Sequence, residues 1–185
     1  MLFFHMEGDF YKNMSQGFNH FDENGNAVMV DVSGKNITYR TAVATGEIHV
    51  GQAIMEAVQE GSVKKGDVLG VARVAGIMGV KRTSELIPMC HPLPIQKCAV
   101  DYELESEKGI IRVFCTVKTE GKTGVEMEAL TGVQVTLLTI YDMCKAIDKH
   151  MVMTNIRMVR NPEKYVHLPH PNIQQSAPKQ DTSHG

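Results

Sequence analysis

A carboxylate and an amine lie three residues apart in this chain, at Asp142 and Lys145. They fall near the end of a stretch that begins at about Val125, in which apolar residues recur at steps of three and four without a proline. That pattern predicts one long helix ending near Lys149, and the spacing places both side chains on one face of it. The two residues are either an exposed ion pair that contributes little to stability, or an acid and a base held together for proton transfer.

A second stretch, over residues 87–93, encloses Cys90 and His91 between two prolines. Proline restricts the backbone, so we expect a stiff connection that follows directly on a preceding helix. A histidine on such a connection suits proton transfer, and a structural histidine is the ordinary alternative. Cys90 as a nucleophile is the weaker interpretation, because no feature of the sequence activates its thiol.

The elements that position these residues are predicted from apolar periodicity. Alternating apolar residues indicate strands, and steps of three and four indicate helices. The order of elements predicts an α+β fold, with helices packed on one face of an antiparallel sheet. Strands are expected over residues 27–33, 38–45, 98–104 and 111–117, with a hairpin turn at 107–109 between the last two, and over 153–159; helices are expected over 52–59, 68–86 and 125–149.

Start signals and small residues add detail to two of these helices. Asp67 precedes the helix expected over residues 68–86 and has the residue type of an N-cap. Thr123 and Glu126 have the spacing of a capping box at the start of the long helix. No strand-to-helix fingerprint precedes the helix expected over residues 68–86. Close packing of another backbone therefore explains the small residues of this helix better than a phosphate-binding loop does. These small residues are Gly70, Ala72, Ala75, Gly76 and Gly79.

Composition excludes several classes of function. The chain has 185 residues, 43% of them hydrophobic, which predicts one soluble domain, over residues 27–160, between a flexible leader (1–26) and a polar tail (161–185). A net charge of −2 gives no basic field for nucleic acid, and no apolar run approaches the roughly 20 residues of a membrane helix. The 4 cysteines stand singly, as in a reduced cytosolic protein, and no two of the 8 histidines stand at a metal-binding step on one helix. We therefore expect no metal site.

Two long motifs and two shorter ones resemble the MoaC family. The long motifs are KRTSELIPMCHPL at residues 81–93 and GKTGVEMEALTG with LTIYDMCKAIDK within residues 121–149. MVDVS at residues 29–33 and KGDVLGVARVAGI at residues 65–77 fit the same family in the same order. The resemblance covers roughly residues 27–160, and four ordered motifs make it far more specific than one short pattern. It implies a ferredoxin-like fold.

The resemblance also implies an activity. Members of this family are cyclic pyranopterin monophosphate synthases of molybdenum-cofactor biosynthesis. They are lyases that convert 3′,8-cyclo-7,8-dihydro-GTP to cyclic pyranopterin monophosphate and release pyrophosphate. The resemblance therefore implies a cytoplasmic enzyme that acts on a nucleotide, uses no cofactor and assembles as a homohexamer, a trimer of dimers.

Site residues follow from the same motifs. By resemblance, Asp142 is a general acid/base kept charged by Lys145, Lys65 is a second catalytic lysine, and His91 is a proton shuttle or a phosphate ligand. Without the resemblance, Lys65 would be read as a solvated loop lysine. The implied substrate contacts are Met89, Cys90, His91, Glu126, Met127 and Glu128. Candidates for binding the phosphates, each of which could be an ordinary surface cation, are Arg40, Lys81 and Lys122.

The spacing of two of these residues has a consequence for assembly. Glu128 and Asp142 lie fourteen residues apart, or roughly 21 Å along one helix. One small substrate cannot touch both ends of the same helix, so we hypothesise that each site is assembled across a subunit interface. Two alternatives remain open. The chain could be a pterin- or nucleotide-binding module without turnover, or a structural oligomer whose helix charges are interface ion pairs.

Overall fold

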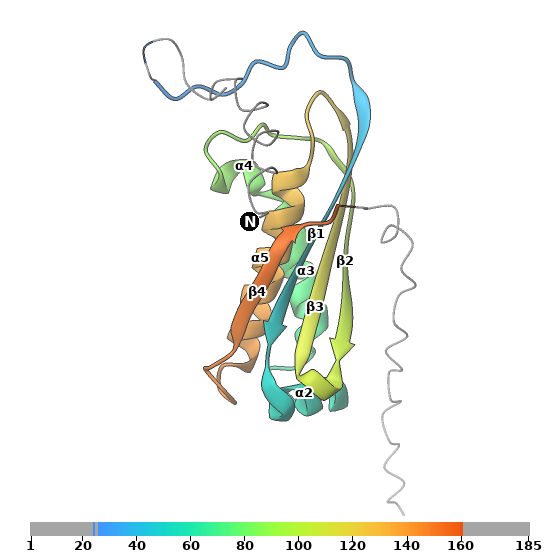
Figure 1. The fold of residues 1–185 in the computed structure, drawn as a ribbon, viewed down its shortest axis with the longest axis vertical. Coiled ribbons are helices and arrows are strands. Elements are labelled where there is room, and N and C mark those ends of the chain that lie inside the picture. The colour runs from blue at the N-terminus through green and yellow to red at the C-terminus, as the bar shows by residue number, and fades with distance from the viewer. Residues whose placement is uncertain (1–23, 25, 161–185) are drawn as a thin grey trace, which may run out of the picture.

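The computed structural model describes residue 24 and residues 26–160. The expected leader, except for residues 24 and 26, and the whole expected tail over residues 161–185 lie outside the described residues. In the described part of the chain, four strands form one antiparallel sheet in the order β2-β3-β1-β4 (Figure 1). Their bounds are β1 Thr38–His49, β2 Ile95–Glu105, β3 Ile110–Gly121 and β4 Val152–Met158.

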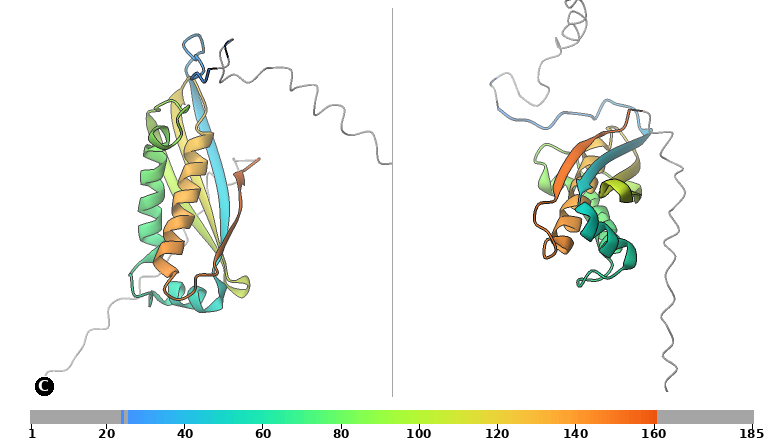
Figure 2. Two further views of the ribbon diagram at one scale, coloured as in Figure 1. Left: turned by 90° about the vertical axis from the view of Figure 1, so that its left-hand side faces the viewer. Right: turned by 60° about the horizontal axis from the view of Figure 1, so that its bottom comes forward.

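Two long helices cover one face of this sheet. In the left view of Figure 2, both lie on the same side of the strands. Together with the strands they follow the chain order β-α-β-β-α-β, which is the ferredoxin-like arrangement that the family resemblance implies. The described helices are α2 Gly51–Glu60, α3 Val68–Lys81, α4 Thr83–Leu86 and α5 Glu126–Cys144, with a short 3-10 turn η1 at Ser106–Lys108.

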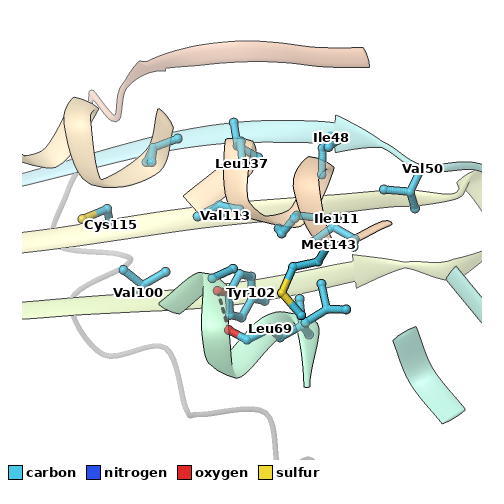
Figure 3. Close-up of a cluster of buried hydrophobic side chains, with 14 of the residues drawn as sticks. Ile48, Val50, Leu69, Val100, Tyr102, Ile111, Val113, Cys115, Leu137 and Met143 are labelled. Atoms are coloured by element: carbon cyan, nitrogen blue, oxygen red, sulfur yellow. Dashed lines mark hydrogen bonds between the residues drawn. The ribbon is translucent and has the colours of Figure 1, made fainter. Parts of the chain in front are cut away.

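The core lies between the sheet and the two long helices (Figure 3). Alternate residues of β1, including Ala44 and Ile48, face the helices and are fully buried. At Gly46 the helix comes so close that an added Cβ would lie 2.7 Å from Cγ1 of Val133. The hydroxyl of Tyr102 on β2 donates a hydrogen bond to the Leu69 carbonyl of α3 at 2.9 Å, which satisfies the buried tyrosine.

The small-residue face of α3 packs closely against another element, as the sequence predicts, and that element is α5. A Cβ at Gly76 would collide with the Thr136 side chain, and one at Gly79 would lie 2.8 Å from Cγ2 of Val135. A side chain at Gly70 is excluded for a different reason, because the Asp67 carboxylate occupies the space beside it. This carboxylate accepts a hydrogen bond from the Gly70 amide at 2.9 Å. The Asp67 N-cap prediction is therefore confirmed.

Three predictions about the helices are wrong in detail. The helix expected over residues 68–86 breaks at Arg82, because the Thr83 hydroxyl bonds back to the carbonyls of Gly79 and Val80 at 3.3 and 3.1 Å. The long helix ends at Cys144 rather than near residue 149. The capping box at its start does not form: the N-cap is Val125, which has no side-chain capping bond.

The expected strand over residues 27–33 is also wrong. These residues form no ladder beyond an isolated bridge at Ala27. The Asp31 carboxylate accepts the Ser33 amide at 2.8 Å, a local bond that competes with strand pairing. The other strands and the helix near residues 52–59 are confirmed, and β1 extends beyond its expected end to His49. None of the helices in the described ranges has the length and apolar character needed to cross a membrane.

The glycine contact between α3 and α5 gives a test of the packing. Gly76→Val should lower the free energy of unfolding by about 1–3 kcal/mol, because the added methyl groups force the two helices apart. Gly34→Val is the control, since nothing lies within 4 Å of a Cβ at that position. Urea unfolding of both variants measures the difference. Equal stability of the two would contradict the close approach.

Candidate active site

Two lysines hold the Asp142 carboxylate between them at the end of α5. Lys145 Nζ lies 2.7 Å from Oδ1, and Lys65 Nζ lies 2.9 Å from Oδ2. Lys65 also donates to the backbone carbonyl of Asp142 at 2.8 Å. Lys65 comes from the loop between α2 and α3, so the fold joins residues 77 positions apart in sequence. We call these three residues the Lys–Asp–Lys cluster.

Contacts within the Lys–Asp–Lys cluster shift the pKa values of Asp142 and Lys145. Hydrogen bonds from Lys145 and then Lys65 lower the pKa of Asp142 to about 2. The hydrogen bond to Asp142 in turn raises the pKa of Lys145. The Asp142 side chain remains 56% exposed, so a ligand can reach the cluster from solvent. At neutral pH the cluster therefore holds one anion and two cations, with a net positive charge.

A cavity of about 230 Å³ lies at the opposite end of α5. Its walls come from the segment before β1, the loop of residues 87–93, and the start of α5. The lining includes all six residues that the sequence assigns to substrate contacts. The full set is Val30, Val32, Lys35, Met89, Cys90, His91, Leu93, Thr123, Gly124, Glu126, Met127 and Glu128.

In the cavity, acidic groups have raised pKa values, whereas the pKa of Asp142 in the Lys–Asp–Lys cluster is lowered. Glu128 is only 4% exposed, and burial raises the pKa of its carboxyl, with a further rise from the charge of Glu126. Burial and then the charge of Glu128 raise the pKa of the Cys90 thiol, which argues against Cys90 as a nucleophile. His91 Nε2 lies 2.9 Å from the Val30 carbonyl and donates to it, because a carbonyl oxygen only accepts.

The two groups of residues lie at opposite ends of the molecule (Figure 1). The loop of residues 87–93 is beside α4 at one end, and the loop that carries Lys65 follows α2 at the other. The cavity includes Glu128 but none of the Lys–Asp–Lys cluster. One chain therefore brings the predicted residues together as two separate groups.

The three candidate phosphate cations have different surroundings. Lys122 Nζ donates to the Ser33 carbonyl at 2.6 Å. The buried Arg40 Nε has no hydrogen-bond partner among the described residues. Lys81 lies near Cys98, and its charge adds to a hydrogen bond from Cys115 in lowering the pKa of the Cys98 thiol. None of these three lines the cavity.

Sequence reasoning missed one wall of the cavity. Val30, Val32 and Lys35 line it, although the alternation of Val30 and Val32 is typical of a strand and Lys35 falls in the turn expected after it. The MVDVS motif at residues 29–33 was the available signal, since it belongs to the resemblance and lies outside any regular element. Sequence reasoning also missed the direct contact between Lys65 and Asp142. Across residues 24 and 26–160, no three His, Cys, Asp or Glu side chains gather so as to hold a metal ion.

Comparison with known proteins decides the family. The sequence model of the MoaC family matches residues 29–163, most of the chain. This protein belongs to the MoaC family. The resemblance carried by the four motifs is thereby confirmed.

Similar proteins from bacteria carry the name cyclic pyranopterin monophosphate synthase, and three of these relatives are described here. The protein from Clostridium botulinum (strain Alaska E43) is 59% identical over 147 residues, which cover 80% of this chain and 92% of the relative. That from Clostridium perfringens (strain 13) is 57% identical over 147 residues, covering 80% and 93%. That from Pelobacter propionicus is 57% identical over 142 residues, covering 77% and 89%.

The opposite pKa shifts of the two carboxyl groups predict opposite effects of pH on stability. The pKa of Asp142 is lowered in the folded state, so its contribution is present above about pH 3.9 and is lost as the pH falls toward 2. The pKa of Glu128 is raised, so its contribution is present below about pH 4.3 and is lost as the pH rises. The advantage of wild type over Asp142→Asn should therefore shrink in acid, and that over Glu128→Gln should shrink toward neutral pH.

Urea unfolding of wild type and the two variants from pH 2 to pH 7 measures both trends. The Lys145→Met background is the control for cause, because removing the largest contributor to the Asp142 shift should weaken only the first trend. Parallel trends for the two variants would contradict the assigned causes.

Proposed function

We propose that this chain is a cyclic pyranopterin monophosphate synthase of molybdenum-cofactor biosynthesis. It converts 3′,8-cyclo-7,8-dihydro-GTP to cyclic pyranopterin monophosphate and releases pyrophosphate, acting as a lyase. The proposal is supported by the names of the relatives and by the share of each chain that the matches cover. The observation that carries it for this chain is the Lys–Asp–Lys cluster, since a module that only binds needs no such acid–base group.

The cavity is proposed to bind the purine-derived end of the substrate. A guanine-like ring presents adjacent N–H donors, and the nearly buried Glu128 carboxylate supplies acceptors of matching geometry. Met89 and Met127 supply polarizable apolar surface beside it. His91 is the proton-transfer group at this end, and Glu126 is a further contact.

The Lys–Asp–Lys cluster is proposed to act on protons and phosphate oxygens. Lys65 and Lys145 bring two ammonium groups to one exposed place, where a phosphate can exchange for the Asp142 carboxylate. When a lysine turns to phosphate, Asp142 loses a hydrogen bond that lowers its pKa. The carboxylate then becomes a stronger base and can act in general acid–base catalysis. Arg40 and Lys81 remain candidates for the other phosphate oxygens.

Each complete site is proposed to form between two subunits. Glu128 and Asp142 lie roughly 21 Å apart along one rigid helix, so a single nucleotide reaches both only if a second chain supplies one of them. An interface with twofold symmetry creates two such sites at once. The assembly that we propose is a homohexamer built as a trimer of dimers, located in the cytoplasm and working without a cofactor.

Turnover of the proposed substrate tests the function directly. Purified protein is incubated with enzymatically prepared 3′,8-cyclo-7,8-dihydro-GTP, and the pterin product and pyrophosphate are quantified together. Wild type should form both in equal amounts. Asp142→Asn should lower kcat by about 10²–10⁴-fold, because the amide keeps the shape but cannot transfer the proton.

Asp148→Asn is the matched control. Asp148 lies beyond the end of α5 and pairs with His150 at 2.7 Å rather than with the Lys–Asp–Lys cluster, so this variant should keep the wild-type rate. Tight substrate binding by wild type without any product would contradict the enzyme and leave a binding module. Equal activity of wild type and Asp142→Asn would remove Asp142 from the chemistry.

A further inference from the structure

The segment of residues 29–35, here called the strap, lies against the chain that leaves β3. The two are brought together by the register of the sheet, in which Thr38 at the start of β1 pairs with Gly121 at the end of β3. The strap, which precedes β1, therefore lies beside Lys122, the first residue after β3. In the sequence, 89 positions separate Lys122 from Ser33. The strap also forms one wall of the cavity, through Val30, Val32 and Lys35.

Three hydrogen bonds hold the strap in shape. Lys122 Nζ donates to the Ser33 carbonyl at 2.6 Å. The Ser33 amide donates to the Asp31 carboxylate at 2.8 Å, and the Lys35 amide closes a turn onto the Val32 carbonyl at 3.1 Å. The bond from the Ser33 amide lowers the pKa of Asp31, and the charge of Lys122 adds to this effect. Of these bonds, the one from Lys122 ties the strap to another part of the fold.

The strap in turn contacts His91. The Val30 carbonyl accepts a hydrogen bond from His91 Nε2 at 2.9 Å. A neutral imidazole carries one hydrogen, so this bond places the hydrogen on Nε2 and the lone pair on Nδ1. The order of contacts is then Lys122 to Ser33, Ser33 through the backbone to Val30, and Val30 to His91.

We propose that Lys122 is a positioning residue that, by holding the strap, fixes the tautomer and orientation of His91 in the cavity. This inference rests on the proposed function for the role of His91 in the reaction. The tautomer matters because a base needs a lone pair and an acid needs a hydrogen at the nitrogen that faces the substrate. Lys122 thus acts through the backbone of residues 30–33 and needs no contact with the substrate.

The position of Lys122 favours this role over phosphate binding. Its ammonium is engaged with a backbone carbonyl, and Lys122 is not among the residues that line the cavity, whereas Lys35 is. A phosphate-binding lysine raises KM when it is lost, since it contributes to binding of the substrate itself. A residue that positions a proton-transfer group lowers kcat instead.

The test measures the His91 tautomer and the kinetics of the same variants. Protein labelled at the histidine ring nitrogens gives long-range hydrogen–nitrogen correlation spectra, in which His91 is assigned by the signals that vanish in His91→Gln. Wild type should show one tautomer at His91, with the hydrogen on Nε2. Lys122→Met should show a mixture of tautomers and a kcat about 10–100-fold lower, with little change in KM.

Two further variants complete the design. Lys122→Arg retains a donor that can reach the Ser33 carbonyl, so it should restore both the single tautomer and most of kcat. Lys108→Met is the matched control, because Lys108 lies in the β2–β3 hairpin and pairs with Glu105, and it should behave as wild type in both measurements.

Two results would overturn the inference. One is a single Nε2–H tautomer retained in Lys122→Met. The other is a loss in Lys122→Met confined to KM, which would make Lys122 a substrate ligand. The spectra need no substrate, so they decide the link between Lys122 and His91 even if wild type proves inactive on cyclic dihydro-GTP. That inactivity would count against the proposed function alone.

Discussion

The close packing of α5 on the sheet is the constraint on which both groups of functional residues depend. Gly46 on β1 lets Val133 and Leu137 of α5 pack directly on the strand backbone, and Gly132 of α5 leaves room for the Cys115 sulfur of β3. The helix is thereby fixed along the sheet as a rigid rod, with its first turn at the cavity and its last at the Lys–Asp–Lys cluster. Because that rod cannot shorten, the fold itself sets the distance between Glu128 and Asp142.

The two ends of α5 show how surroundings give two carboxylic acids different properties. At the exposed end, two ammonium groups stabilise the charged form of Asp142 and lower its pKa. At the buried start of the helix, desolvation disfavours the charged form of Glu128 and raises its pKa. One helix thus carries a carboxylate that stays ionised and a carboxyl that retains its proton to higher pH. A reaction that needs several proton transfers uses groups of both kinds.

Much of this architecture could be predicted from the sequence, because the signals were local. Alternation located β2 and β3, and the small residues of α3 predicted the contact at Gly76 and Gly79. The strap was misjudged because Val30 and Val32 alternate as in a strand, while the deciding bond, from the Ser33 amide to Asp31, depends on local backbone geometry that periodicity does not encode. The contact of Lys65 with Asp142 depends on how the loop after α2 packs against the end of α5. Such a tertiary contact between distant residues leaves no local pattern in the sequence. The family motifs named both residues but could not pair them.

The central claim is that each active site combines the cavity of one subunit with the Lys–Asp–Lys cluster of another. Complementation between two inactive variants tests it most directly. Asp142→Asn and Glu128→Gln are each assayed alone, and are then unfolded together, refolded as a mixture and assayed again. If sites are shared between subunits, random pairing restores both native residues at about one quarter of the sites, and activity should rise toward that fraction of wild type. Activity that stays at the average of the two separate variants would contradict the account, because each chain would then hold its own complete site.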